Sequence, residues 1–369
     1  MELKMDDFDR FGLEMERECL ITTMQAMVET VGSDGTIKLL RPYLENSGKA
    51  FALNLGEWTK DDDAILRLAK TMIMGQMPMG QECKSFYVLG GEAFFESEGC
   101  PFLGTIPEIC ECYCSIFAGS FTRQIDPDLE IESTPGNGTE NPRCKWRFYH
   151  RTQTPMSDFS IRELDVEALM SQISGEEMEW RSHHYIGGVW EMITYAMVNG
   201  LGSEAMLGSL SGYMRRNGFS FGLRIKSYRG IEGRDLDSIL SALEVFSKAI
   251  CQKQVRPSSG PEELKVLVSA CPFSSDYATP EHCQLIENIN DGICKAINPD
   301  YEFHYDSMMT NGADGCQWTV RRRPPHQKGR EIETRGQNAE QSLLSVLKMR
   351  LAKGEISLEQ YEKIAQVLK

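Results

Sequence analysis

Six cysteines recur as two sets of three, and their thiols are the groups in this chain best suited to chemistry. The first set is Cys100, Cys110 and Cys144, and the second is Cys271, Cys283 and Cys316. In each set one cysteine follows a predicted strand, one lies in the first turn of a predicted helix, and one begins a later strand. We therefore expect the three thiols of a set to meet at one edge of a sheet.

Three interpretations of these thiols stay open. Free cysteines often pack as small buried hydrophobes. Converging thiolates suit Zn²⁺, which takes four ligands in a structural site, and Cys114 or Cys294 would then supply the fourth. A reactive thiol is the third, because the first turn of a helix, where Cys110 and Cys283 lie, lowers a thiol pKa. A Cys/His nucleophile is open only to the second set, where His282 precedes Cys283.

Two tryptophans follow the last cysteine of each set by two residues. Trp146 and Trp318, together with Phe102 and Phe273, are either core residues or the walls of an apolar ligand pocket between a sheet and helices.

These residues belong to an internal repeat with an offset of about 171 residues. The repeated motifs are Cys-Pro-Phe at 100–102 and 271–273, Pro-Glu-x-Cys at 107–110 and 280–283, and Cys-x-Trp at 144–146 and 316–318. Chance does not produce colinear cysteine, proline and tryptophan matches over this length. A single module has therefore been copied.

Each copy is predicted to begin with three helices. Glycine is expected to cap the first helix (Gly32, Gly202) and to end a short second one (Gly48, Gly218), and Asp63 and Asp237 are expected as N-caps of the third. Apolar runs at 85–89 and 264–268 predict equivalent strands. A helix (107–121, 280–296) and two alternating strands follow in each copy.

The predicted fold is α+β, with two duplicated modules of helices packed on an antiparallel sheet that form a pseudo-twofold body. The first module spans 1–150 and the second 165–322, with linkers at 151–164 and 323–339. A helical hairpin at 340–369 closes the chain. Its sequence at 351–361, Leu-Ala-Lys-Gly-Glu-Ile-Ser-Leu-Glu-Gln-Tyr, resembles the short C-terminal SHOCT domain, which implies self-association or tethering.

The composition argues against two classes of partner. The 369 residues carry a net charge of −15, and nucleic acids and anionic membranes both attract positive surfaces. The basic run at 321–323 is better explained as a solvated linker. No secretion signal or membrane span is visible, and 12 cysteines are too few for a disulfide-stapled scaffold, so we expect a reducing, cytoplasmic location.

The order of the repeated motifs over 86–148 and 264–320 resembles the 4-vinyl reductase domain group and its relative, the L-2-amino-thiazoline-4-carboxylate hydrolase-like family. The resemblance implies an α+β fold that pairs in a twofold manner and encloses a small-molecule pocket. It also implies zinc beside that pocket, at cysteines like Cys110 and Cys144 or Cys283 and Cys316. Ser133 stands near the position where such sensors have a further cysteine.

Two functions follow as expectations. The first is a binding protein, a sensor or carrier of a small molecule. The alternative is a hydrolase of a small cyclic C–N/C–S substrate, with Cys110 or Cys283, or a metal-bound water, as nucleophile. The lack of a repeated histidine or acid/base pair favours binding. One copy can also have become a scaffold for the other.

Overall fold

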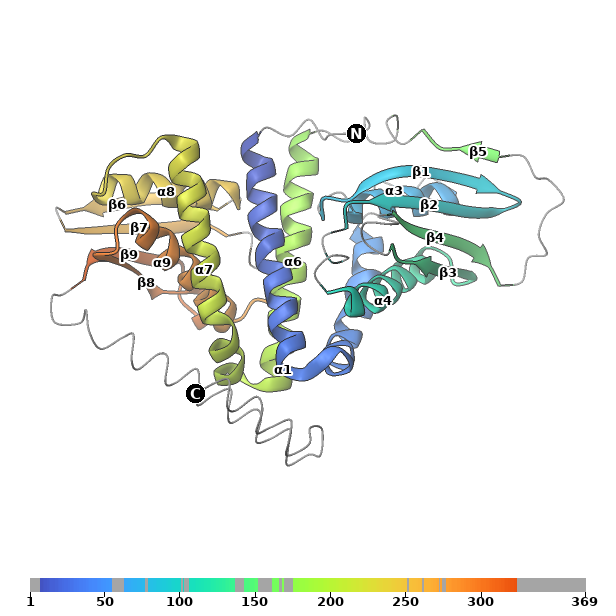
Figure 1. Cartoon of the computed structure of the whole chain (residues 1–369), viewed down its shortest axis with the longest axis horizontal. Coiled ribbons are helices and arrows are strands. Elements are labelled where there is room, and N and C mark those ends of the chain that lie inside the picture. The colour runs from blue at the N-terminus through green and yellow to red at the C-terminus, as the bar shows by residue number, and fades with distance from the viewer. Residues whose placement is uncertain are drawn as a thin grey trace, which may run out of the picture. The chain divides into compact units, whose positions relative to one another are not determined.

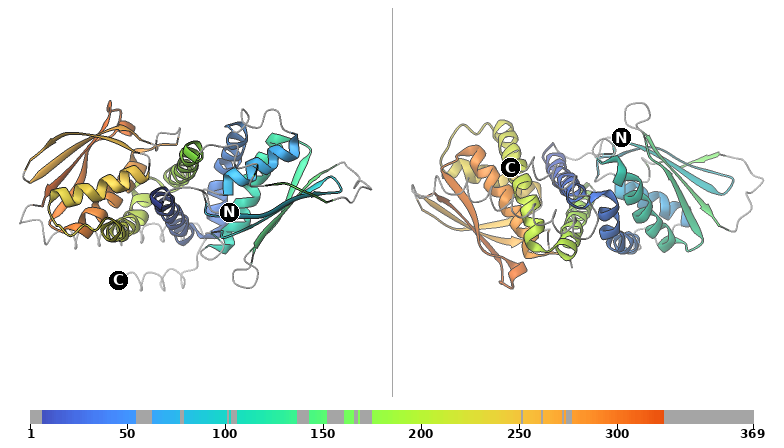
Figure 2. Two further views of the ribbon diagram at one scale, coloured as in Figure 1. Left: turned by 90° about the horizontal axis from the view of Figure 1, so that it is seen from above. Right: turned by 60° about the horizontal axis from the view of Figure 1, so that its bottom comes forward.

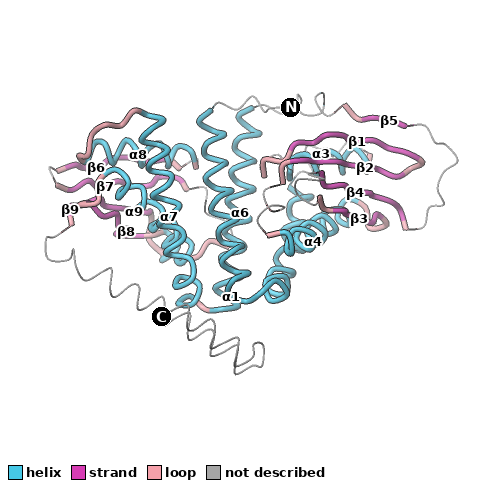
Figure 3. Tube along the Cα trace, in the orientation of Figure 1, coloured by secondary structure: helices cyan, strands magenta, loops and turns pink. Residues whose placement is uncertain are grey.

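The computed structural model has an α+β fold (Figures 1 and 3). It describes residues 7–54, 63–76, 79–100, 102, 106–136, 143–151, 161–165, 168, 175–250, 252–260, 262–271, 273 and 277–323. The chain divides into two compact units, Met1–Ile193 and Thr194–Lys369. The predicted hairpin at 340–369 and almost all of the linker at 323–339 lie outside the described residues, and the module boundaries stay a prediction.

The first unit holds one five-stranded antiparallel sheet and the helices packed on it. Its elements are α1 (Asp7–Asn54), α3 (Ala64–Gln76), β1 (Glu82–Leu89), β2 (Glu92–Glu98), α4 (Pro107–Ile125), β3 (Leu129–Thr134), β4 (Arg143–His150), β5 (Ile161–Glu163) and most of α6 (Gly175–Leu201). The strand order is β3-β4-β2-β1-β5. The short strand β5 lies within the predicted linker.

The second unit repeats this arrangement. After the end of α6 it holds α7 (Ser203–Arg229), α8 (Leu236–Ala249), β6 (Lys253–Ser259), β7 (Glu263–Ala270), α9 (Pro280–Ile297), β8 (Tyr301–Ser307), a 3-10 turn (Met309–Asn311) and β9 (Cys316–Arg322). Its strand order, β8-β9-β7-β6, matches β3-β4-β2-β1 of the first unit element by element. The duplication inferred from the sequence therefore extends to the topology.

In each unit the helices cover one face of the sheet (Figure 2). On β4 the side chains of Cys144, Trp146 and Phe148 are buried beneath them. The residues between them point the other way and form ion pairs: Lys145 with Glu96 at 3.2 Å and Arg147 with Glu92 at 2.6 Å. This alternation is the period-two pattern of a strand with one solvated face.

Gly32 and Gly202 end the first helix of each copy as predicted, whereas Gly48 and Gly218 do not end the second. Gly32 has φ +75° and kinks α1, and Gly202 has φ +86° at the break between α6 and α7, so both mark a change of direction. The second helix is long, and it contains Gly48 and Gly218 in its interior. The physical reason is that α1 packs on α4, and α7 on α9, closely enough that no Cβ fits there.

Each copy also has one more strand than predicted. Residues 85–89 lie in β1, but 264–268 lie in β7, which corresponds to β2, so the predicted equivalence of these two runs is wrong. In the first copy the strand that was not predicted is β2, which forms a hairpin with β1. Its turn is Gly90-Gly91, both with positive φ, which is the conformation of a tight two-residue hairpin turn.

Aspartates do cap the third helix, but the predicted residue is correct only in the first copy. The Asp63 carboxylate accepts a hydrogen bond from the Leu66 N–H at 2.8 Å. In the second copy the cap is Asp235, which accepts from the Ser238 N–H at 2.9 Å, and Asp237 lies in the first turn. Within the described segments, no helix combines the length and apolarity needed to cross a bilayer.

Candidate functional site

The structure brings the first set of thiols together. Cys100 directly follows β2, Cys110 lies in the first turn of α4, and Cys144 is the second residue of β4. The Sγ atoms of Cys100 and Cys110 are 4.0 Å apart. Cys144 also interacts with Cys100, and its sulfur accepts a hydrogen bond from the Gly136 N–H at 3.5 Å.

The second set lies in the corresponding positions, but its thiols accept hydrogen bonds from groups other than thiols. The donors are Gln252 Nε2 to Cys271 at 3.9 Å, Thr310 Oγ1 to Cys283 at 3.3 Å, and the Met309 N–H to Cys316 at 3.3 Å. Cys283 and Cys316 are still near enough to raise the pKa of Cys271. The two sets therefore share a location but differ in their partners.

Several of these thiols are held in the protonated form. Interaction with Cys110 and burial raise the pKa of Cys100 to about 11, although Cys144 lowers it. The contact with Cys100 lowers the pKa of Cys110. Cys114 and burial together raise this pKa by more than Cys100 lowers it, so the net shift is upward. Burial raises the pKa of Cys271 to about 12. At neutral pH these groups are therefore thiols, which are weak nucleophiles.

The geometry of the described residues supplies no ligand set for the zinc interpretation and no base for the nucleophile interpretation. Across the described ranges, no group of three or more His, Cys, Asp or Glu side chains is arranged to hold a metal ion. Cys114 lies near Cys110, whereas Cys294 is fully buried in α9. A zinc site stays a prediction.

His282 is a buried, neutral histidine. Its Nδ1 is 2.9 Å from Thr194 Oγ1, and its ring packs on Phe273 with centroids 5.2 Å apart. Burial lowers its pKa to about 3, so it is a very weak base at neutral pH. Phe273 and Trp318, which packs on Phe303 at 5.0 Å, are core residues of the second unit.

A cavity of about 50 Å³ lies in the first unit, between α3, α4, α6 and the sheet. Two residues singled out from the sequence, Phe102 and Trp146, are part of its wall. The complete lining is Thr71, Met72, Gly75, Met79, Gln81, Phe102, Tyr113, Cys114, Phe117, Ala118, Phe121, Trp146 and Tyr185.

Two phenols give this apolar cavity its polar character. Tyr113 is 6 % exposed, and its hydroxyl interacts with the Tyr185 phenol without making a hydrogen bond of ordinary length to a described residue. Burial raises its pKa, and Tyr185 lies close enough to raise it further. Phe102 packs on Tyr113 with ring centroids 5.2 Å apart, and Phe51 packs on Tyr185 at 5.0 Å. Tyr113 and Tyr185 therefore place two phenols among the residues that line the cavity.

Sequence reasoning missed these phenols. Tyr113, Phe117 and Phe121 recur every four residues along α4, a spacing that places them on one face, so a signal for them was present. The sequence contains no signal for Tyr185, because this residue lies in α6, which belongs to the second copy by sequence. By their distance from the helix start, Ile286 and Asn290 of α9 replace Tyr113 and Phe117, so the aromatic lining is not repeated.

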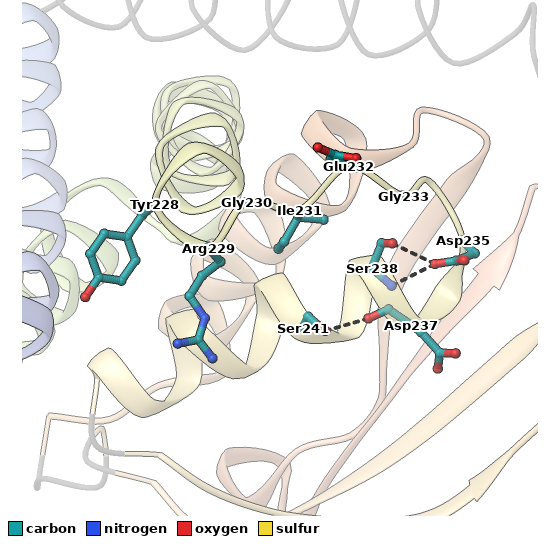
Figure 4. Close-up of a pocket in the computed structure, with 10 residues that line it drawn as sticks. All are labelled: Tyr228, Arg229, Gly230, Ile231, Glu232, Gly233, Asp235, Asp237, Ser238 and Ser241. Atoms are coloured by element: carbon teal, nitrogen blue, oxygen red, sulfur yellow. Dashed lines mark hydrogen bonds between the residues drawn. The ribbon is translucent and has the colours of Figure 1, made fainter.

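A second, open hollow of about 810 Å³ surrounds the turn between α7 and α8 (Figure 4). Its polar contacts are those of a helix start: Asp235 accepts from the Ser238 N–H and Oγ, and Ser241 donates to the Asp237 carbonyl. These groups satisfy one another, so the hollow is a capped turn, and none of the repeated cysteines or tryptophans lines it.

Comparison with known proteins returns no matching family model, curated protein or solved structure.

Proposed function

We propose that this chain is a small-molecule-binding protein, a sensor or carrier, whose site is the cavity of the first unit. The observation that carries the proposal is the pair of buried phenols at the aromatic wall: the Tyr113 hydroxyl interacts with the Tyr185 phenol but makes no hydrogen bond of ordinary length to a described residue. Leaving such a group unsatisfied costs about 1–3 kcal/mol. A ligand that accepts a hydrogen bond from this phenol would recover that free energy.

The lining defines the ligand by its chemistry. Phe102, Phe117 and Trp146 favour an apolar or aromatic body, and Tyr113 favours one hydrogen-bond acceptor on it. The cavity is smaller than the roughly 150 Å³ that accommodates a benzene ring in an engineered core. A ring-sized ligand therefore requires the side chains of Met72 and Met79 to move, which unbranched thioethers do readily.

The hydrolase alternative receives less support. Cys110 has a raised pKa, and His282, beside Cys283, has a pKa of about 3. Neither a thiolate nor a base matched to neutral pH is therefore provided at these positions. A cytoplasmic location and self-association through residues 340–369 remain predictions of the sequence.

The proposal is tested with two ring-sized probes that differ in one acceptor. Pyridine, neutral at pH 8, offers a ring nitrogen to the Tyr113 hydroxyl, whereas benzene offers none. We expect saturation-transfer NMR on the full chain to detect both probes and to show tighter binding of pyridine. In Tyr113→Phe the preference for pyridine should disappear.

The matched control is Tyr305→Phe, which removes a buried phenol from the second unit and should leave the preference unchanged. Absence of saturation transfer from either probe, or a pyridine preference that survives in Tyr113→Phe, would show that this cavity is not the binding site.

A further inference from the structure

We propose that Cys100 and Cys110 form a modification site, a dithiol that a small disulfide such as glutathione disulfide oxidises to an intramolecular disulfide. The proposal does not depend on ligand binding in the cavity. It rests on the arrangement of the two sulfurs, on their unequal exposure and on the contrast with the second set of thiols.

The two sulfurs are already in contact. Their separation of 4.0 Å joins the residue after β2 to the first turn of α4. A disulfide bond is about 2.05 Å long, so the sulfurs must approach by roughly 2 Å for the bond to form. Because the pair is held together by the fold, its closure is intramolecular and favoured over reaction with a second molecule.

Unequal exposure sets the order of the exchange steps. Cys100 is partly exposed, whereas Cys110 is 2 % exposed. The Cys100 thiolate attacks one sulfur of glutathione disulfide, which forms a mixed disulfide and expels one glutathione thiolate. Cys110 then loses its proton and attacks the Cys100 sulfur, which expels the second glutathione. The protein loses two protons and two electrons, and glutathione disulfide gains them as two glutathione thiols.

The second copy supplies an internal control. Cys271 and Cys283 occupy the corresponding positions, and they accept hydrogen bonds from Gln252 and Thr310, which compete with any approach of the two sulfurs. In the first copy the sulfurs of Cys100 and Cys110 are 4.0 Å apart. We therefore expect the two equivalent pairs to behave differently under the same conditions.

The environment of the pair sets the conditions for the experiment. Burial and neighbouring thiols raise the pKa of Cys100 to about 11, so only a small fraction is thiolate at neutral pH. Exchange should therefore accelerate about tenfold for each pH unit up to that value. Among the described side chains, Cys114 and Cys144 also neighbour the pair and compete as partners for Cys110.

The experiment exposes the full chain to millimolar glutathione disulfide at pH 8.5, followed by acid quenching, alkylation and cleavage after glutamate. The sequence then separates the two thiols, because Cys100 falls in peptide 99–108 and Cys110 in peptide 109–111, whereas Cys271 and Cys283 fall in 264–281 and 282–287. Mass spectrometry identifies which peptides are joined.

We expect peptides 99–108 and 109–111 to be joined at least tenfold more than 264–281 and 282–287. In Cys100→Ser that product should vanish, while Cys271→Ser should leave it unchanged. The wild-type comparison needs no variant to fold. A glutathione adduct that persists on Cys100, a dominant link from Cys110 to Cys114 or Cys144, or equal joining in both copies would each overturn the assignment.

Discussion

Gly218 of α7 lies directly against the backbone of Ile289 in α9: a Cβ on Gly218 would be 2.0 Å from the Ile289 carbonyl oxygen. Gly48 has the same relationship to α4, where a Cβ would be 2.4 Å from the Phe117 carbonyl oxygen. Both copies have therefore kept the helix crossing that holds the sheet-covering helix in place, and both use glycine at the crossing point.

Substituting these glycines should separate the helices. We expect Gly218→Ala and Gly48→Ala each to lower the free energy of unfolding by about 1–3 kcal/mol, because the added methyl group overlaps backbone atoms that cannot move alone. The control is Gly212→Ala in α7, where the nearest atom is a flexible Arg216 nitrogen at 3.7 Å. That variant should be up to about 1 kcal/mol more stable than wild type. Urea titration checks all three, and equal stability of Gly218→Ala and Gly212→Ala would contradict the crossing.

The start of α8 gives a second prediction. Asp235→Ala should lower the thermal midpoint by about 2–4 °C, because the Ser238 N–H and hydroxyl lose their acceptor. Asp237→Ala removes the same charge two residues later without removing the cap, and it should change the midpoint less. Differential scanning fluorimetry of the two variants distinguishes them. A larger effect of Asp237→Ala would mean that the cap does not stabilise α8.

Much of the fold was predictable because the repeat provides two versions of each element. The helices at 107–125 and 280–297 and the alternating strands that hold Trp146 and Trp318 lie where their periodicity predicted. Gly48 and Gly218 were misread because a sequence does not distinguish a glycine that ends a helix from one where another helix crosses. Only the approach of Ile289 or Phe117, far away in the chain, makes that distinction.

The candidate site was half predictable. Phe102 and Trp146 were identified because they flank repeated cysteines, and both line the cavity. Tyr113 and Tyr185 break the repeat, so a comparison of the two copies directed attention away from them. The repeat reports what the copies share, whereas the cavity depends on side chains that only the first unit has.

The buried histidine of the second unit predicts a pH dependence of stability. His282 has a pKa of about 3 when folded and an ordinary value near 6.5 when unfolded, so the unfolded chain binds more protons between these values. Its contribution is complete above pH 6.5 and is lost as the pH falls toward 3. As the pH falls from 7 to 5, proton binding by His282 in the unfolded chain should lower the free energy of unfolding by about 2 kcal/mol.

His282→Gln should remove that dependence, since glutamine does not titrate and retains a group that can bond Thr194. His304→Gln is the control, because His304 is exposed and pairs with Glu287 on the surface. Urea titrations at pH 7 and pH 5 measure both. If His282→Gln loses as much stability as wild type over this range, His282 is not the buried neutral group described above.

The last prediction concerns the cost of keeping a donor at the cavity. Tyr113→Phe removes a buried hydroxyl whose interaction with Tyr185 falls short of an ordinary hydrogen bond, so the ligand-free protein should gain about 1 kcal/mol of unfolding free energy. Thr23→Val is the contrasting deletion, because the Thr23 hydroxyl donates to the Cys19 carbonyl at 2.8 Å and accepts from the Trp190 indole N–H at 2.9 Å. That variant should lose about 1–3 kcal/mol. If urea titration shows that Tyr113→Phe raises the free energy of unfolding and Thr23→Val lowers it, the Tyr113 hydroxyl is a group that reduces stability, as is expected of a binding residue. A loss in Tyr113→Phe would show instead that the hydroxyl is satisfied within the fold.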